Sequence, residues 1–139
     1  MQQADIFNPV LWTLVLTIIV WLVTLASRLN YFLKQGVDPN GIRTQDRLVA
    51  ALPDFAKYPS DNFKNLFEVP VLFYVICAYL FMTQTVDATH ITCAWVFCIG
   101  RYAHSLVQCT FNNVNVRFLV YLISTGAVFT MIVRALFAL

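Results

Sequence analysis

Two apolar stretches of the sequence carry polar side chains at the spacing of a helix face. On the first, Asp61, Asn65 and Glu68 stand at i, i+4 and i+7, so they share one face. On the second, a longer polar stripe stands at i, i+3, i+4, i+7 and i+11: Arg101, His104, Ser105, Gln108 and Asn112. Ionisable and amide groups are costly in apolar surroundings, and both stripes should therefore face the interior of a helix bundle.

An ion pair between the two stripes is expected. With a rise of about 1.5 Å per residue, Glu68 lies about 12 Å along its helix from Ser60. On an antiparallel partner helix, Arg101 lies about 14 Å from Thr110. The carboxylate and the guanidinium therefore meet at a similar depth. Such a pair can serve helix packing alone.

More polar residues gather at this end of the stripes than one ion pair needs. They are Asn65, His104, Ser105, Gln108, Asn113 and Arg117. This surplus favours a polar pocket, in which the cations Arg101 and Arg117 and the carboxylate Glu68 suit an anionic or zwitterionic small molecule. An arginine beside a thiol favours the thiolate and lowers the thiol pKa, which is how a cysteine-containing peptide becomes a nucleophile.

The composition is that of a membrane protein. Of the 139 residues, 60% are hydrophobic and 12% are charged, whereas about 25% are charged in an ordinary soluble domain. With 4 Gly and 5 Pro, the chain is neither collagen-like nor of low complexity. A net charge of +2 without a basic run argues against nucleic-acid binding. The length allows one domain, and we predict a single all-α integral membrane domain over residues 1–139.

The uncharged stretches predict a bundle of four transmembrane helices. The spans are expected at about 7–27, 62–86, 89–111 and 117–138, with a cytoplasmic loop at about 28–60. Each span can cross about 30 Å of hydrocarbon as a helix, the third with Arg101 and His104 inside the membrane. Transmembrane strands would need repeated alternating segments, which the sequence lacks. Ser60 is expected to cap the second helix, and Pro70 should kink it just beyond Glu68.

Basic residues set the expected orientation. Six of them lie between the uncharged run that ends at Ser27 and the one that begins at Val69: Arg28, Lys34, Arg43, Arg47, Lys57 and Lys64. Arg117 lies at the turn before the uncharged run that begins at Phe118, and the loop between the second and third spans has no Lys or Arg. Because basic loops stay in the cytoplasm, both termini should lie on the opposite side. The first span is too long for the apolar core of a signal peptide and lacks a basic residue before it, so it should be a retained helix.

Several other polar residues are expected to have no part in chemistry. His90 should be solvated in the outer loop, and Arg134 should extend to the membrane interface. The four cysteines, at positions 77, 93, 98 and 109, fall within apolar spans without a metal-ligand spacing. We expect them to be inert packing residues, with no disulfide and no metal site.

Two sequence motifs contain the polar stripes. The first is Asn65-Leu66-Phe67-Glu68-Val69-Pro70-Val71-Leu72-Phe73, and the second is Gly100-Arg101-Tyr102-Ala103-His104-Ser105, followed by Arg117. Together they resemble the MAPEG family (membrane-associated proteins in eicosanoid and glutathione metabolism) over roughly residues 61–125. The form is closest to the short bacterial members. The family includes microsomal glutathione transferases, leukotriene C synthase and microsomal prostaglandin E synthase.

The resemblance implies a homotrimer of four-helix protomers in a bacterial inner membrane, with glutathione bound between subunits near the cytoplasmic side. The positions that match glutathione contacts of the family are Asn65, Glu68, Arg101, His104, Tyr121 and, more loosely, Arg28. Arg117 matches the arginine that stabilises the glutathione thiolate, and it is therefore the implied catalytic residue.

The chain also departs from the family pattern at three positions. Asp61 stands where family enzymes commonly carry an arginine, Gln108 where the synthases carry an aromatic hydroxyl, and Asn113 where they carry an arginine. Each lost charged contact costs about 1.5–3 kcal/mol, which would weaken glutathione binding.

The implied function is that of a glutathione-dependent transferase or peroxidase acting on apolar electrophiles or lipid hydroperoxides from the bilayer. Its partners would be membrane lipids, a small apolar substrate and further copies of the chain. A non-catalytic membrane binding or scaffold protein of the same fold is the alternative, and Asp61 and Gln108 favour it. A small proton-coupled exporter is a third alternative because of the lone intramembrane Glu68, although an Arg101 partner would hold that carboxylate ionised.

Overall fold

The computed structural model describes residues 2–36 and 44–138, and every regular element in these ranges is a helix. The elements are the 3-10 helix η1 (Gln3–Ile6) and the α-helices α1 (Phe7–Gln35), α2 (Gln45–Ala51), α3 (Asp54–Asn65), α4 (Val69–Met82), α5 (Ala88–Cys109) and α6 (Val114–Phe137). Arg43 of the predicted basic loop lies outside the described residues.

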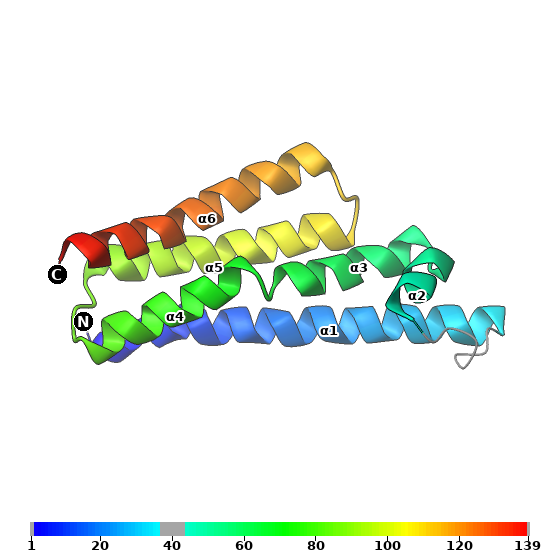
Figure 1. Cartoon of the computed structure of the whole chain (residues 1–139), viewed down its shortest axis with the longest axis horizontal. Coiled ribbons are helices and arrows are strands. Elements are labelled where there is room, and N and C mark those ends of the chain that lie inside the picture. Colours follow the sequence, from blue (N-terminus) through cyan, green and yellow to red (C-terminus); the bar gives the residue numbers. More distant parts are fainter. Residues whose placement is uncertain (1, 37–43, 139) are drawn as a thin grey trace.

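The long helices lie side by side in an elongated bundle (Figure 1). α1 runs away from the N-terminus, α3 and α4 return in succession, α5 runs out again and α6 returns (Figure 1). Both termini and the α4–α5 connection therefore lie at one end, which we call the terminal end. The short helix α2 and the α5–α6 turn lie at the opposite end, which we call the α2 end (Figure 1).

Three helical segments are long and apolar enough to cross a membrane: Gln3–Gln35, Asp54–Met82 and Val114–Phe137. The prediction of an all-helical chain with segments that can span a membrane is thus confirmed for the described residues. α5 is 22 residues long but is not among these segments, because its polar stripe lowers its mean hydropathy. The outer surfaces are apolar, with exposed side chains such as Leu11, Ile18, Ile99 and Leu106. Such a surface suits lipid rather than water.

The connection between the first two long segments is more helical than predicted. α1 continues past Ser27 to Gln35, and Gly36 ends it in the left-handed conformation at φ 60°, which glycine adopts without steric cost. The prediction that Ser60 caps a helix is wrong, because α3 already begins at Asp54 after Pro53. Asp54 is favourable in the first turn of a helix, where its charge meets the positive end of the helix dipole.

The kink predicted near Pro70 is present as a full break between α3 and α4. α3 ends at Asn65, and Glu68 precedes α4 with φ −99° and ψ −101°. Pro70 lies in the first turn of α4, where its missing N–H has no helical partner to lose. The break leaves backbone polar groups without their usual helical partners, and it lies beside the candidate site described below.

The apolar core fills the terminal half of the bundle. The rings of Phe73 on α4 and Phe97 on α5 pack with centroids 4.3 Å apart, and α6 adds Val128 and Met131. All four cysteines are free. Cys77 and Cys98 are buried, as expected of packing residues.

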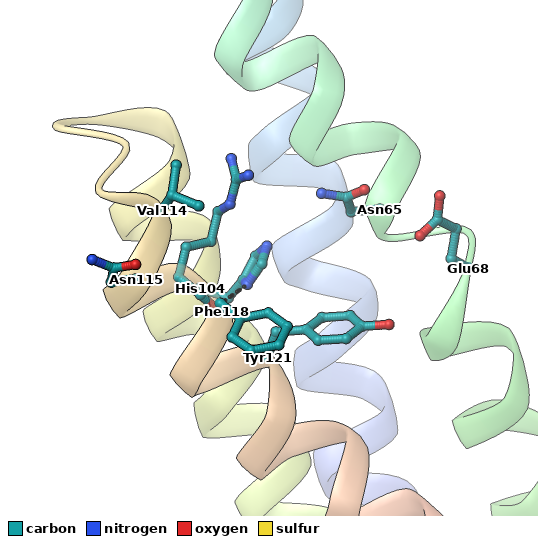
Figure 2. A pocket seen from close by; sticks show the side chains of 8 residues that line it. Asn65, Glu68, His104, Val114, Asn115, Phe118 and Tyr121 are labelled. Atoms are coloured by element: carbon teal, nitrogen blue, oxygen red, sulfur yellow. Dashed lines mark hydrogen bonds between the residues drawn. The ribbon is translucent and has the colours of Figure 1, made fainter.

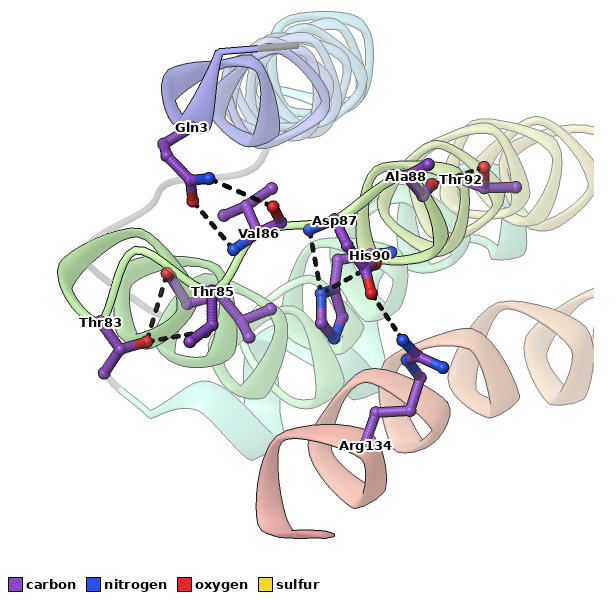
Figure 3. Close-up of polar contacts among 10 residues, drawn as sticks. Gln3, Thr83, Thr85, Val86, Asp87, Ala88, His90, Thr92 and Arg134 are labelled. Atoms are coloured by element: carbon purple, nitrogen blue, oxygen red, sulfur yellow. Dashed lines mark hydrogen bonds and ion pairs between the residues drawn. The ribbon is translucent and has the colours of Figure 1, made fainter. Parts of the chain in front are cut away.

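At the terminal end, a polar cluster closes the start of α5 (Figure 3). The Asp87 side chain accepts from the backbone N–H of His90 at 2.8 Å and pairs with the guanidinium of Arg134. The expectation of a solvated His90 is wrong, because the residue is 5% exposed and its Nδ1 accepts from the backbone N–H of Asp87 at 3.3 Å. Arg134 does not simply reach for the interface but ties α6 to the cap of α5.

Replacing Asp87 by Ala should lower the free energy of unfolding at neutral pH by about 1 kcal/mol, the usual worth of a helix N-cap. Burial acts to raise the pKa of Asp87, but the hydrogen bonds from His90 and Arg134 outweigh it and lower the pKa below its usual value. A carboxylate with a lowered folded-state pKa stabilises the protein above its unfolded pKa and loses that effect as the pH falls through the folded value.

Thermal unfolding in detergent at several pH values tests this assignment. Asp87→Asn is the matched control, because Asn also caps helices but cannot pair with Arg134. The stability difference between the original protein and this control should shrink as the pH is lowered below about 4. A difference that stayed constant over that range would show that the charge of Asp87 is irrelevant.

Candidate functional site

A pocket of about 380 Å³ opens where the α3–α4 break faces α5 and the start of α6, in the half of the bundle nearer the α2 end. Eight residues line it: Asn65, Glu68, His104, Val114, Asn115, Arg117, Phe118 and Tyr121. Figure 2 shows Asn65 and Glu68 on one wall and the α6 residues Val114, Asn115, Phe118 and Tyr121 on the other, with His104 between them.

Arg101 lies behind this pocket, fully buried at 0% exposure. Its Nη2 donates to the backbone carbonyl of Asn65 at 3.0 Å. This carbonyl is at the end of α3, where the break removes the usual helical donor, and a cation there also meets the negative end of the helix dipole. Arg101 thus caps the broken helix.

The predicted ion pair between Glu68 and Arg101 is wrong. Glu68 lies in the break itself, and its exposed side chain lines the pocket instead of turning into the bundle. Among the described residues, no carboxylate pairs with Arg101, and its Nε and Nη1 are buried without any hydrogen-bond partner. Within the described residues, the guanidinium therefore has no carboxylate in direct contact, and its positive charge lies beside Asn65 of the pocket.

A hydrogen-bond network orients two side chains of the pocket, the amide of Asn65 and the imidazole of His104. The buried Gln108 places its Oε1 3.0 Å from Nδ2 of Asn65, which donates to it, and 3.0 Å from Nε2 of His104. Nδ1 of His104 lies 3.3 Å from the backbone carbonyl of Arg117. Gln108 therefore positions Asn65 and His104 without itself lining the pocket.

Arg117 is held at the pocket by the turn between α5 and α6. Its Nη1 donates to Oδ1 of Asn112 at 2.7 Å, and Asn112 itself has a φ of 46°, which asparagine tolerates better than most residues. The neighbouring Asn113 caps α6 by accepting from the backbone N–H of Val116 at 3.1 Å. Within residues 2–36 and 44–138, the other N–H groups of the Arg117 side chain make no hydrogen bond, and Arg117 lines the pocket.

The structure brings together most, but not all, of the site residues proposed from the sequence. Asn65, Glu68, His104, Arg117 and Tyr121 line one pocket, with Arg101 behind it. Arg28 does not join them within one chain, because it lies in a different groove between α1 and α3.

Asp61, one turn before Asn65 on α3, is also not among the residues that line the pocket. It is exposed, and its Oδ1 lies 3.5 Å from Nζ of Lys64. The carboxylate that stands where family enzymes commonly carry an arginine therefore does not act as part of this pocket's lining.

Three pocket residues were not found from the sequence: Val114, Asn115 and Phe118. A signal for two of them exists, because Val114, Arg117, Phe118 and Tyr121 stand at i, i+3, i+4 and i+7 and share a face of α6. Val114 and Phe118 are apolar, however, and apolar residues on one face of a helix that is apolar throughout do not indicate a site. Asn115 does not share this spacing.

Deeper in the bundle, a second polar group locks α3 to α5. The fully buried Asn62 accepts from the hydroxyl of Ser105 at 3.2 Å and donates from Nδ2 to the sulfur of Cys109 at 3.4 Å. These contacts fix the height of α3 against α5, and therefore the position of the helix break relative to Arg101.

Comparison with known proteins identifies the family. A model described as the MAPEG family matches residues 6–137. The chain belongs to the MAPEG family. The resemblance seen in the motifs at residues 61–125 is thereby confirmed, and it extends over nearly the whole chain. No curated protein and no solved structure matches the chain. The chain is therefore an integral membrane protein of the MAPEG family.

Within this MAPEG protein, the pocket presents groups of both charges to a ligand. Glu68 offers an exposed carboxylate, which suits an ammonium group. Arg117 offers N–H donors at the opposite wall, and Arg101 adds an unpaired positive charge behind Asn65. Such an arrangement favours a small zwitterion with an additional anionic group.

Proposed function

We propose that this protein is a glutathione-dependent membrane transferase or peroxidase that acts on apolar electrophiles or lipid hydroperoxides from the bilayer. The observation that carries the proposal is the pocket itself. It gathers Asn65, Glu68, His104, Arg117 and Tyr121 from three separate parts of the chain. These are five of the positions that match glutathione contacts in the MAPEG family.

The donor set of the pocket fits glutathione. Glutathione supplies a thiol nucleophile, an ammonium group and carboxylates. Arg117 would hold the sulfur as thiolate, because a neighbouring cation favours the charged form. Glu68 would pair with the ammonium group, and Asn65 would hydrogen-bond the peptide. The unpartnered N–H groups of Arg101 favour an anion nearby, since they are buried without one.

The proposed assembly has four spans per chain and three chains per complex. α5, at 22 residues, is about 33 Å long and is sufficient to cross the hydrocarbon. Its polar residues Arg101, His104 and Gln108 are all buried inside the bundle, as a membrane requires. In a bacterial inner membrane, the basic α2 end would face the cytoplasm and both termini the opposite side.

A glutathione titration of the detergent-purified protein tests the proposal. We expect a saturable rise in ultraviolet thiolate absorbance and an increase in melting temperature with glutathione. Replacing Arg117 by Leu should raise the pKa of the bound thiol by about one unit or more, which removes the thiolate signal at neutral pH.

Arg134→Leu is the matched control, since it removes an arginine from α6 at the terminal end. It should leave the thiolate signal unchanged. No binding of glutathione at millimolar concentration would contradict the proposal, and an unchanged signal in Arg117→Leu would move the role of thiolate stabilisation to another residue.

A non-catalytic binding protein of the same fold is the second candidate. The network around Gln108 favours it, because Nδ2 of Asn65 already donates to Gln108 and Nη1 of Arg117 to Asn112. Glutathione binding with no thiolate signal in the original protein would support this candidate. A proton-coupled exporter is the third candidate. An Arg101 partner would have held the Glu68 carboxylate ionised, and no such salt bridge is present among the described residues. Membership of the MAPEG family nevertheless disfavours an exporter.

A further inference from the structure

Gln108 on α5 is buried, at 3% exposure, and contacts two side chains of the candidate pocket from behind. Its Oε1 lies 3.0 Å from Nδ2 of Asn65 and 3.0 Å from Nε2 of His104, so both contacts converge on one oxygen atom. An amide oxygen can accept two hydrogen bonds, whereas an amide nitrogen can only donate. A single acceptor atom therefore fixes both neighbours.

The Gln108 amide cannot turn over by itself. A half-turn would place its NH2 group against Nδ2 of Asn65, so that two donors would meet. The same half-turn would bring the NH2 group to Nε2 of His104, which could accept a hydrogen bond only without a proton of its own. Asn65 and His104 would both have to change at the same time. Gln108 therefore holds Asn65 by its Nδ2 and His104 by its Nε2–H.

This contact determines which end of the Asn65 amide faces the pocket. Because Nδ2 donates to Gln108, Oδ1 is the end left for a ligand, and it accepts no hydrogen bond within the part of the chain that the structure describes. Figure 2 shows Nδ2 of Asn65 on the side of His104 and Oδ1 on the side of Glu68. The exposed Glu68 side chain is also an acceptor, because an ionised carboxylate has no donor. These two side chains therefore offer a ligand only hydrogen-bond acceptors.

We propose that Gln108 is a specificity-determining residue, which turns Asn65 so that the pocket selects a ligand with a free ammonium group. An ammonium group has three donors and a positive charge, which suit the amide oxygen of Asn65 and the carboxylate of Glu68. The ligand class is a small thiol peptide with an unblocked amino group, and glutathione is one member. Gln108 acts through Asn65 and does not touch the ligand. The ligand class rests on the proposed function, whereas the orientation of Asn65 does not.

Solid-state NMR of the histidine ring nitrogens, in the full chain in lipid bilayers, tests the orientation without any ligand. The protein contains 2 histidines, His90 and His104, and His90→Gln assigns their signals. Nε2 of His104 should carry a proton, because the atom that faces it is the oxygen of Gln108. An unprotonated Nε2 would overturn the proposal. Gln108 would then present its NH2 group to both neighbours, and Asn65 would present its own NH2 group to the pocket.

Gln108→Met tests the same contact by removing the acceptor at a similar side-chain length. Within the described residues, the carbonyl of Arg117, 3.3 Å from Nδ1 of His104, is then the acceptor left to the ring, and the proton of the neutral imidazole should move to Nδ1. Gln108→Glu keeps an oxygen in place and should keep the proton on Nε2. Tyr102→Phe is the matched control, because it removes another side-chain hydrogen bond of α5, from the Tyr102 hydroxyl to the carbonyl of Trp12. It should leave the His104 signals unchanged.

The affinities for glutathione and for the same peptide without its amino group test the ligand class. The original protein should bind glutathione about a hundredfold more tightly, a ratio typical of two hydrogen bonds to a charged group. Gln108→Met should reduce this preference to about tenfold, because Glu68 remains but Nδ2 of Asn65 then has an acceptor only on the pocket side. Gln108→Glu and Tyr102→Phe should keep the full preference.

Two results of this comparison would overturn the specificity assignment. They are equal affinities of the original protein for the two peptides, and an equal preference in the original protein and in Gln108→Met. The second result would show that Gln108 supports the fold alone. Binding of neither peptide would overturn the proposed function together with the ligand class, whereas the His104 signals decide the orientation of Asn65 separately. If Gln108→Met does not fold, the Nε2 signal of the original protein still decides that orientation.

Discussion

Replacing Gly100 by Ala should destabilise the protein by about 1–3 kcal/mol, the usual cost of overfilling a packed interface. A Cβ atom built on Gly100 would lie 2.7 Å from the Cβ of Ser124 on α6. Neither atom can move away by rotating a side chain, because each is fixed to its own backbone. The two helices would have to separate, and Ser124 is fully buried between them.

The effect should extend to the pocket as well. Ser124 stands one turn after Tyr121, and its hydroxyl donates to the carbonyl of Tyr121 at 3.0 Å. A shift of α6 away from α5 would therefore also move Tyr121 and Arg117 relative to His104. We expect Gly100→Ala to lower both the melting temperature and the affinity for glutathione, measured by thermal shift with and without the peptide.

Gly126 offers the matched control on the other helix. A Cβ atom at Gly126 meets nothing within 4 Å, and Gly126→Ala should stabilise the protein by about 0.5–1 kcal/mol through helix propensity. Adding Ser124→Gly to Gly100→Ala should restore much of the lost stability, because it removes the atom that clashes. Similar melting temperatures for the two single alanine variants would show that α5 and α6 are not in close contact.

The sequence predicted the helices well because its signals are local. Uncharged stretches identified the long helical segments, and Pro70 identified the break in the second of them. The stripe from Arg101 to Gln108 correctly predicted which face of α5 is buried. These inferences need only helical spacing and the cost of burying polar groups.

The details that failed depend on backbone geometry that spacing cannot supply. Counting residues placed Glu68 and Arg101 at the same depth, which assumed that the second helix is continuous. The break at residues 66–68 turns Glu68 outward and presents the carbonyl of Asn65 to Arg101 instead. A proline in the sequence indicates that a helix is disturbed, but not which side chain then faces the bundle.

The roles of the two other arginines at this end show the same limit. The motif resemblance predicted one shared site for Arg28 and Arg117, but within one chain they line different pockets. Which helix packs against which face of α1 is a property of the whole bundle. Residue types and spacing therefore predict a cationic role for each arginine but not the residues that surround it.

Replacing Arg101 by Met should have opposite effects on stability and on ligand binding. The guanidinium is 0% exposed with one hydrogen bond, and two of its nitrogen atoms have no partner in the part of the chain that the structure describes. Exchanging buried charged groups for apolar ones of similar volume is often neutral or stabilising by about 1–4 kcal/mol. Part of this gain is lost because the carbonyl of Asn65 loses its donor, at about 1 kcal/mol. We expect the variant without ligand to melt at a higher temperature.

Glutathione should no longer stabilise this variant. If the charge of Arg101 helps to hold an anion in the pocket, its removal leaves no such attraction behind Asn65, and the thermal shift with glutathione should fall to near zero. Arg101→Lys is the control, since it keeps the positive charge and loses the planar donors. It should keep part of the thermal shift with glutathione but gain none of the stability of the Met variant.

A lower melting temperature for Arg101→Met would instead support the Glu68–Arg101 ion pair, which the structure does not contain. If Arg101→Met were strongly destabilised, a carboxylate would have to compensate Arg101 in the membrane, and Glu68 is the candidate that helix spacing places at a similar depth. In that case Glu68→Gln alone would destabilise the protein more than Glu68→Gln combined with Arg101→Met. The structure predicts instead that Glu68→Gln changes stability little, because its exposed carboxylate has no ion partner among the described residues. A fold that keeps a buried, unpaired cation beside a pocket gives up stability there, and such a loss is typical of a site built to bind a charge.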